Sequence, residues 1–206
     1  AVQALDADPP SIWQRRGAHD DAFRVSVGSG TMRWTSSDGA RTEVLDDLPV
    51  EIDLGPGARV AVIGPHAADL ARGLLIQLAV AVGPADWQLH VHPADHPAER
   101  WWRTLPHHSA DASPADHHTL VVTDRIAEAA ERSSALRRRL QMRPLDALLV
   151  VDHDAVAAPA CCTTVVTTMS DGSARVDLDT HDDQPPARAS ITGLSGPAAA
   201  RHAQRL

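Results

Sequence analysis

The chain has 206 residues, of which 43% are hydrophobic and 22% charged, and its net charge at pH 7 is −8. This length and composition predict globular material with one substantial core, and they exclude a disordered or fibrous chain. The acidic balance excludes a protein that binds nucleic acid alone, because phosphate contacts need a basic face. We therefore expect no direct nucleic-acid partner.

Lysine and asparagine are absent from the whole sequence. Without lysine the chain cannot form a Schiff base or use a lysine as general base. It also cannot supply the lysine that a phosphate-binding loop places against nucleotide phosphates. The missing lysine therefore removes several enzymatic mechanisms at once.

The cysteines and the N-terminal residues bear on the compartment. Cys161 and Cys162 are adjacent and cannot form an ordinary disulfide with each other, so we interpret them as small core residues in a reducing compartment. No run of about 18 apolar residues predicts a membrane span. Residues 1–10 show no signal peptide and no initial Met. We expect a cytoplasmic segment of a longer chain.

The first part of the chain reads as short strands. Residues 23–27 alternate between apolar and polar, residues 28–30 (Gly-Ser-Gly) are predicted to turn the chain, and residues 31–35 to return as a hairpin. Residues 36–40 contain a second turn signal, and residues 50–54 alternate again before a Gly-Pro-Gly connection. We predict a β-rich N-terminal subdomain or lead-in over residues 1–57.

Strands and helices alternate after residue 57. Residues 59–63 form a nearly continuous apolar run, typical of a strand buried on both faces. Residues 66–82 have apolar positions at helical spacing. The remaining predictions are a strand over 87–92, a short helix over 95–102, a loop over 106–118, a strand over 119–123, a helix over 126–140, a strand over 146–151, edge strands over 163–168 and 174–178, and a helix over 195–206.

This alternation predicts an α/β domain over residues 58–206, with right-handed crossovers between parallel strands. Its plan is that of a P-loop, RecA-like protein: a mostly parallel sheet flanked by helices, preceded by a small β-hairpin layer. The connection after residue 63 is where such a protein binds phosphate, because free N–H groups and the helix dipole meet there.

The sequence of this connection departs from a working phosphate loop. The pattern G-x-x-x-x-G-K-[ST] would need a second glycine at Asp69, a lysine at Leu70 and a serine or threonine at Ala71. Pro65 has no N–H group, and Asp69 brings negative charge toward any phosphate. We interpret it as a degenerate Walker A loop or an ordinary strand-to-helix turn. The residues nearest to a bound phosphate would be Gly64, His66, Asp69 and Arg72.

The end of the strand over residues 119–123 shows whether the Walker B acids are present. P-loop ATPases use acidic groups at this strand end to hold Mg²⁺ and position water. Asp124 occupies the Walker-B-like position, but Arg125 follows it where a second acid is expected. A lone aspartate at a strand end also serves as a helix cap, so the role of Asp124 stays open. We predict no catalytic residue and no cofactor, with ATP and Mg²⁺ bound only under an alternative interpretation.

Four segments resemble the actinobacterial branch of the FtsK/SpoIIIE family, which includes DNA translocases and the membrane ATPases of type VII secretion, some of them linked to a forkhead-associated domain. Residues 12–16 (IWQRR) and 21–30 (DAFRVSVGSG) resemble the family's W-x-R-R … D-F-x-x-x-R-V-G-x-G stretch. Residues 101–107 (WWRTLPH) are similar to W-x-x-x-L-P-H, and residues 159–168 resemble P-x-x-C-x-x-x-V.

The resemblance makes 119–124 the Walker B strand and 146–151 the sensor strand. With the family's Lys and Glu missing, it implies a non-catalytic pseudo-ATPase module with a structural or regulatory role. The parent would be a hexameric, ATP-driven translocase at the plasma membrane, and the partners other domains or subunits of that motor. Whether the cargo is DNA or protein stays open. The alternatives are a weak ATPase that uses Arg72 in place of lysine, and a module that binds a peptide or secretion signal.

Other constellations carry less weight. The twelve histidines invite a metal site, but we expect the paired histidines of the polar 106–118 loop to face water. No G-x-S-x-G elbow supports a serine hydrolase. The arginines 137–139 read as a solvated helix end. We expect the tryptophans to anchor packing, with Trp101 or Trp102 marking a contact surface.

Overall fold

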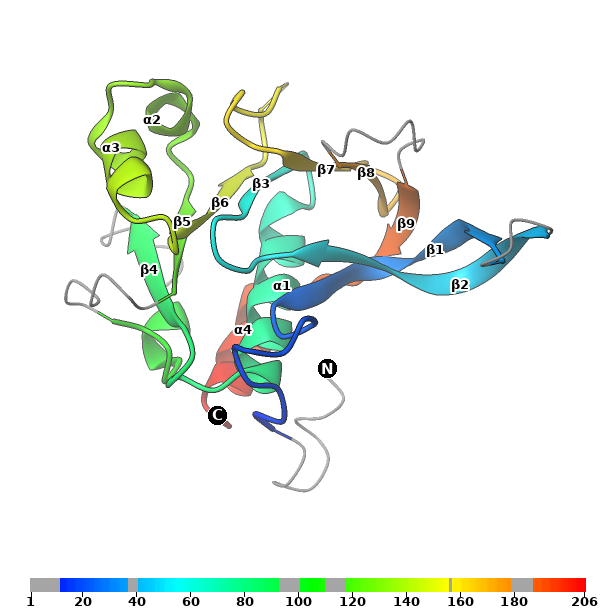
Figure 1. Ribbon diagram of the computed structural model, residues 1–206, viewed down its shortest axis with the longest axis horizontal. Helices are drawn as coiled ribbons and strands as arrows, with labels where there is room; N and C mark the ends of the chain where they lie inside the picture. The colour runs from blue at the N-terminus through cyan, green and yellow to red at the C-terminus, as the bar shows by residue number, and fades with distance from the viewer. Residues whose placement is uncertain (1–11, 37–40, 93–100, 110–117, 156, 179–186) are drawn as a thin grey trace.

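The computed structural model describes residues 12–36, 41–92, 101–109, 118–155, 157–178 and 187–206. Within these residues nine strands form one sheet, in the order β2-β1-β9-β8-β7-β3-β6-β5-β4 (Figure 1). The strands are β1 (Arg24–Thr35), β2 (Thr42–Asp53), β3 (Arg59–Ile63), β4 (Gln88–His92), β5 (Thr119–Thr123), β6 (Ala147–Asp152), β7 (Thr164–Thr168), β8 (Ser173–Leu178) and β9 (Ala187–Ile191). The helices are α1 (Ala67–Ala81), the 3-10 helix η3 (Trp101–Thr104), α2 (Ile126–Ala130), α3 (Ala135–Met142) and α4 (Gly196–Ala203).

The sheet has a parallel half and an antiparallel half. The neighbours β7, β3, β6, β5 and β4 run parallel to one another, whereas β7, β8, β9, β1 and β2 pair antiparallel. Helix α1 joins β3 to β4, and α2 and α3 join β5 to β6. The predicted P-loop-like α/β fold with flanking helices is therefore confirmed, on a mixed sheet.

Side chains alternate across the parallel strands and build a core on each face. Val60 and Val62 of β3 belong to the larger core with α1, while Ala61 and Ile63 belong to a smaller core with α2 and α3. Period-two alternation with both faces covered explains why the strand reads as an unbroken apolar run. Helix α1 is apolar almost all round because it lies between the sheet and α4 (Figure 1).

One buried amide ties α1 to the antiparallel half. The Gln77 side chain is 9% exposed, its Oε1 accepts from the Ser26 N–H at 2.9 Å, and its Nε2 donates to the Ser26 carbonyl at 2.9 Å. The register of β1 against β2 shifts between Ser26 and Gly28, which leaves these backbone groups for the side chain. The Gln77 amide therefore supplies hydrogen bonds to both the N–H and the carbonyl of Ser26.

The predicted turn at residues 28–30 is wrong. β1 runs through this segment to Thr35, and β2 is its hairpin partner. The glycines allow close approach instead of a turn: a Cβ at Gly28 would lie 1.8 Å from the Ser190 carbonyl oxygen, and one at Gly30 2.0 Å from that of Arg188. The chain turns later, where the Ser36 N–H donates to the Arg41 carbonyl at 2.8 Å. The Asp-Gly turn signal at residues 38–39 falls outside the described residues.

Two further expectations need correction. β7 and β8 are interior strands, because β3 pairs with β7 and β9 continues the sheet beyond β8. The helix predicted over 126–140 is two helices, since Ser134 accepts a hydrogen bond from the Arg137 N–H at 3.1 Å and starts α3 as its N-cap. The helix predicted over 95–102 falls mostly outside the described residues, of which 101–104 form η3.

The parallel strands and the closing helix lie within a few residues of their predicted bounds. By contrast, β2 begins at Thr42, well before the alternation predicted over residues 50–54, and β9 was not predicted. The predicted domain boundary at residue 57 stays a prediction. In the structure, β9 pairs with β1, so the hairpin β1–β2 and the rest of the strands form one continuous sheet. Among the helices of the described ranges, none has both the length and the apolar character needed to cross a membrane.

A buried carboxylate joins α3 to the start of β6. Asp146 is 0% exposed and receives Arg139 Nε at 2.8 Å and Arg143 Nε at 3.0 Å. Arg59 Nη1 donates to the Asp146 carbonyl at 2.7 Å. Arg139 is therefore a structural partner of the core, and the interpretation of residues 137–139 as a solvated helix end is wrong for it.

We expect Asp146→Asn to lower the free energy of unfolding by about 3 kcal/mol, because two guanidinium groups lose their buried counter-charge. Urea unfolding measures this loss. The matched control is Asp177→Asn, which removes an exposed pair with Arg175 and should cost less than about 1 kcal/mol. Equal losses in the two variants would contradict the structural role of Asp146.

Two histidines of the predicted polar loop are buried, contrary to expectation. His107 is 1% exposed, stacks on Trp87 with ring centroids 4.4 Å apart, and its Nε2 lies 2.8 Å from the Val82 carbonyl oxygen. His118 is 5% exposed and packs edge-on against Phe23. Burial lowers the pKa of His107 to about 4, since the charged ring would be desolvated. His107 therefore acts as a neutral packing residue.

The depressed pKa of His107 predicts a loss of stability as pH falls from about 6.5 toward about 4, because only the unfolded state takes up the proton in this window. His107→Phe should keep the stack on Trp87 and reduce this pH dependence. The Val82 carbonyl would still accept from Trp87 Nε1 at 3.1 Å. Urea midpoints at pH 7.0 and 5.0 measure the effect, with the exposed His153→Gln as control. If the urea midpoint of His107→Phe changes with pH as much as that of the unaltered protein, the role of His107 is contradicted. Burial also lowers the pKa of His90 to about 4, so part of the pH dependence of stability should remain in the variant.

Candidate functional site

The connection between β3 and α1 is only three residues long. β3 ends at Ile63 and α1 begins at Ala67, two residues before the position where a phosphate loop has its second glycine. Gly64 has φ of +102°, and a Cβ there would lie 2.4 Å from the Thr168 carbonyl oxygen. A glycine is therefore required at this position by backbone geometry and by contact with β7.

The backbone donors of this connection are already used. The Gly64 N–H donates to the Asp152 carbonyl at 2.9 Å, the His66 N–H to Thr168 Oγ1 at 3.0 Å, and the Ala67 N–H to the Gly64 carbonyl at 3.0 Å. Pro65 has no N–H group. A phosphate cradle needs successive N–H groups that point at a common anion. Residues 64–67 present no such set.

The positions of the missing lysine and hydroxyl face the core. Leu70 is 0% exposed and Ala71 4% exposed, and both pack in the larger hydrophobic core. Leu70 fills the layer between α1 and the sheet and lines no cavity, whereas Ala71 packs in the same core and also lines the cleft described below. A lysine at position 70 would be buried away from any phosphate.

Asp69 and Arg72 pair with each other. Asp69 Oδ1 lies 2.6 Å from Arg72 Nη1, and Arg72 Nη1 also lies 3.4 Å from the Leu194 carbonyl oxygen. The Leu194 N–H donates to the Asp69 carbonyl at 2.8 Å, so the segment before α4 packs over this first turn of α1. The ion pair holds Arg72 toward Asp69, which disfavours it as a substitute for the phosphate-loop lysine.

Asp124 follows β5 as predicted and is exposed. Its Oδ1 lies 3.8 Å from Arg125 Nε, and the N-cap residue of α2 is Arg125, not Asp124. The Arg125 N–H donates to Thr123 Oγ1 at 3.0 Å. Arg125 therefore occupies the position of the second acid of the ATPase pattern, and its guanidinium group lies beside Asp124.

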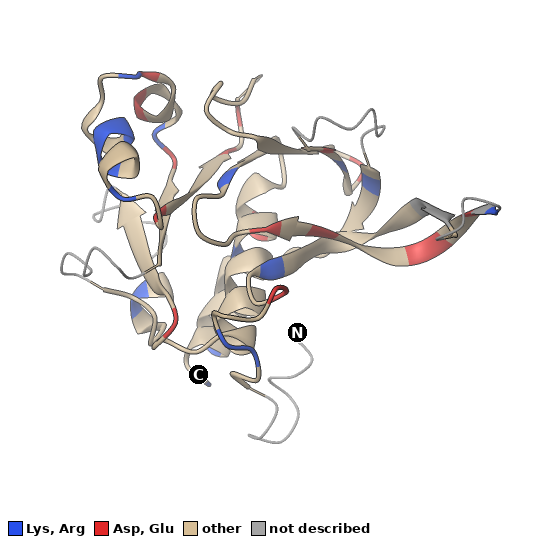
Figure 2. Cartoon of the chain, viewed as in Figure 1, with Lys and Arg blue, Asp and Glu red and all other residues tan. Residues whose placement is uncertain are grey.

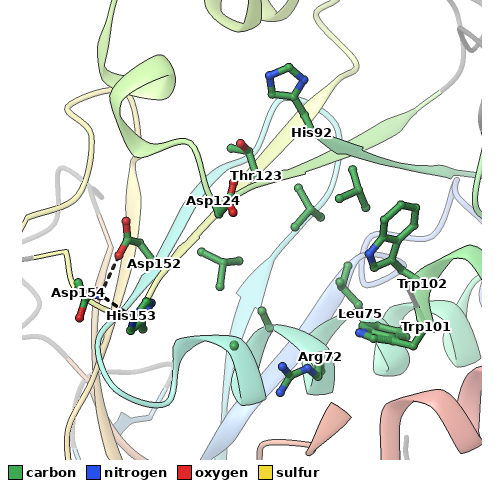
Figure 3. Close-up of a pocket in the computed structure, with 15 residues that line it drawn as sticks. Arg72, Leu75, His92, Trp101, Trp102, Thr123, Asp124, Asp152, His153 and Asp154 are labelled. Atoms are coloured by element: carbon green, nitrogen blue, oxygen red, sulfur yellow. Dashed lines mark hydrogen bonds and ion pairs between the residues drawn. The ribbon is translucent and has the colours of Figure 1, made fainter. Parts of the chain in front are cut away.

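A cleft of about 490 Å³ opens at the carboxyl ends of the parallel strands (Figure 3). This edge is where open α/β sheets bind their ligands. Arg72 and Asp124 contribute to its wall, whereas Gly64, His66 and Asp69 do not. Its lining comprises Ala68, Ala71, Arg72, Leu75, Val91, His92, Trp101, Trp102, Val122, Thr123, Asp124, Val151, Asp152, His153 and Asp154.

Sequence reasoning missed most of this lining. Asp152 and Asp154 could have been found from the rule that ligands meet the carboxyl end of a buried parallel strand, because both follow the predicted strand over 146–151. The approach of η3 to the sheet carried no local signal. Trp101 and Trp102 are both buried against the core and both line the cleft, so the expected contact surface at one of them stays a prediction.

The charged groups of the cleft give it an acidic balance. The charge-coloured ribbon shows Arg and acidic residues distributed over the fold (Figure 2), and among the described residues Arg72 is the one arginine in the lining of the cleft. Arg72 is paired with Asp69, and His92 Nε2 lies 2.8 Å from Glu128 Oε2. Three aspartates lie along the wall: Asp124, whose Oδ1 is 3.8 Å from Arg125 Nε, Asp152, and Asp154, which is 2.9 Å from His153 Nε2. Such a wall repels a polyphosphate.

Metal ligands do not converge in the part of the chain that the structure describes, where no group of three or more His, Cys, Asp or Glu side chains could hold an ion. His117, one of the loop histidines considered as a metal ligand, falls outside those residues. Cys161 and Cys162 are half-buried free thiols beside the smaller core, in agreement with their interpretation as packing residues.

The order of strands and helices is that of a P-loop-like α/β domain. No protein-family model matches the sequence, and no curated protein matches it. Solved structures do: the cytoplasmic domain of the type VII secretion ATPase EccC from Thermomonospora curvata aligns with a TM-score of 0.62 at 14% identity, covering 98% of this chain and 32% of that one. ATPases 2 and 3 of the same EccC, in complex with a signal sequence peptide, align with a TM-score of 0.55 at 13% identity, covering 94% and 48%.

At these identities the likeness establishes the fold. The chain spans about a third of the length of the first of these structures.

We expect Leu70→Lys to destabilise the protein by about 3 kcal/mol without creating nucleotide binding, because the new ammonium group would be buried without a partner. Urea unfolding measures the loss, and calorimetric titration with Mg²⁺·ATP measures binding. Ala127→Lys adds a lysine at an exposed position of α2 and is the control. A stable Leu70→Lys protein that binds ATP would show that the loop is closer to a working one than its hydrogen bonds indicate.

Proposed function

We propose that this chain is a non-catalytic module of an ATP-driven motor of the FtsK/SpoIIIE type, of the kind used in type VII secretion. The observation that carries the proposal is the loop between β3 and α1, whose N–H groups are bonded within the protein and whose lysine position is a buried leucine. The likeness to EccC supports the motor assignment at the level of the fold.

A module of this kind acts through contact. Its sheet and flanking helices keep the overall shape of an ATPase domain, so it can occupy the place of one beside active copies without a nucleotide to bind. The parent protein would be membrane-associated, and its other domains or subunits would be the partners. The acidic charge of −8 disfavours direct contact between this module and nucleic acid.

A second candidate is a module that binds a peptide, including a secretion signal. Two observations favour it: the cleft of about 490 Å³ has a largely apolar lining, and one structural neighbour is a complex with a signal sequence peptide. Saturable binding of a signal peptide of the parent's own substrates, unaffected by Mg²⁺·ATP, would select this candidate over a purely structural role.

Calorimetric titration of the chain with Mg²⁺·ATP and with a slowly hydrolysed analogue tests the proposal. We expect no saturable heat up to about 1 mM nucleotide, a concentration at which a weak site with Kd near 1 mM would be half filled. An FtsK/SpoIIIE-type ATPase domain with an intact G-x-x-x-x-G-K-[ST] loop is the positive control. Clear saturation by this chain would overturn the non-catalytic assignment.

A further inference from the structure

The cleft has two chemically different ends. Figure 3 shows Trp101, Trp102 and Leu75 together at one end, and Asp152, His153 and Asp154 at the other, with Asp124 between them along the wall. A ligand that fits both ends must carry an apolar group and, some distance away, a group that acidic side chains stabilise.

The apolar end of the cleft is formed by side chains of the larger hydrophobic core. Trp101 is 8% exposed and Trp102 4% exposed, and both pack with Leu75 in the larger core. Val91 and Val122, at the ends of β4 and β5, are partly buried against the same core and form the floor. Enclosed aromatic and aliphatic walls of this kind bind an apolar ring or chain.

One polar atom at this end has no partner. Trp101 Nε1 is buried and makes no hydrogen bond within the described residues. Figure 3 draws its indole nitrogen on the side that faces the middle of the cleft. A buried N–H left without an acceptor costs free energy, and it recovers that cost when a ligand supplies an oxygen. The ligand should therefore carry a carbonyl or similar acceptor beside its apolar group.

The opposite end stabilises positive charge. Asp152 Oδ1 accepts the N–H groups of Asp154 and Ala155 at 2.8 and 3.0 Å, which fixes its carboxylate at the end of β6. Cations also face this end: Arg125 Nε lies 3.8 Å from Asp124, His153 lies 2.9 Å from Asp154, and Arg72 is bound to Asp69. Asp152 pairs with none of these cations at 4 Å or less in the described residues, so its charge is available to a ligand.

We propose that the cleft binds an organic cation in which an apolar group, a carbonyl oxygen and an ammonium or guanidinium group follow one another along a short chain. This inference rests on the proposed absence of nucleotide from this edge of the sheet. The apolar group lies between Trp101 and Leu75, the carbonyl accepts from Trp101 Nε1, and the cation lies beside Asp152 and Asp124.

Three probes of equal chain length separate these contributions. N-(4-aminobutyl)benzamide carries all three groups, 5-benzamidopentanoate replaces the ammonium by a carboxylate, and 6-phenylhexylamine lacks the carbonyl. We expect the first to bind saturably by calorimetry and the carboxylate to bind at least about tenfold more weakly, a difference of about 1.4 kcal/mol. Binding of the cation should weaken at high salt. Equal binding of cation and anion, or no binding of either, would overturn the proposal.

Two variants assign the ends of the cleft. Asp152→Asn keeps the Oδ1 acceptor of its turn and should weaken N-(4-aminobutyl)benzamide about tenfold, while Asp171→Asn, on an exposed turn with the same kind of Oδ1 contact, should leave binding unchanged. Trp101→Phe keeps a ring but removes the N–H, so it should weaken the benzamide and not 6-phenylhexylamine. An unchanged benzamide affinity in both Asp152→Asn and Trp101→Phe would overturn the assignment.

The source of the cation is tested with N-acetyl-phenylalanyl-lysine amide, which carries the same groups in a peptide. Tighter binding of this dipeptide than of the benzamide indicates a basic peptide segment, and the reverse indicates a free small molecule. Mg²⁺·ATP is titrated in competition. If ATP displaces the benzamide, both the proposed function and this inference fail. If neither ligand binds, only this inference fails.

Discussion

The hydroxyl group of Thr168 bonds to both sides of the β3–α1 connection: it accepts the His66 N–H at 3.0 Å and donates to the Ile63 carbonyl at 3.1 Å. It can do so because β7 lies directly beside β3 and because Gly64, at φ +102°, brings its backbone against Thr168. With the connection bonded to β7, α1 begins early and turns Leu70 and Ala71 into the core. The bonded His66 N–H and the early start of α1 follow from this contact between neighbouring strands, while the Asp152 carbonyl holds the Gly64 N–H separately.

Electrostatics at the same edge agree with that constraint. A nucleotide site combines free donors, a lysine and a metal between acids, whereas here donors are bonded internally, the guanidinium of Arg72 is held by Asp69, and Arg125 stands beside Asp124. The free volume lies farther along the edge, between η3 and the ends of β4, β5 and β6, with an apolar floor and an acidic wall. The cleft thus lies at the edge where proteins of this fold class bind ligands, but its acidic wall favours a positively charged ligand over a phosphate.

The sequence predicted the parallel strands well because each is a short apolar run bounded by glycine, proline or polar residues. It failed where long-range contact decided the outcome. Gly28 and Gly30 look like a turn locally, but they are needed because β9 approaches their backbone. Arg139 looks solvated on its helix, and His107 on its loop, but a buried aspartate and a tryptophan ring from other elements enclose them. In the site, Asp124 and Arg72 were found through motif position, whereas Trp101 joins the cleft through packing of η3 that no local pattern encodes.

The pairing of β9 with β1 also governs how the molecule can assemble. Gly28 pairs with Ile191, and β9 is the only strand of the described residues that connects the hairpin β1–β2 to the parallel half. Such distant pairing requires closure of a very long loop, which slows folding. During synthesis the hairpin emerges first and waits for β9, so its long exposed edge depends until then on α1, through the Gln77 side chain, for attachment to the growing core. That interval is when a chaperone or a neighbouring subunit has access to the unpaired edge of β1.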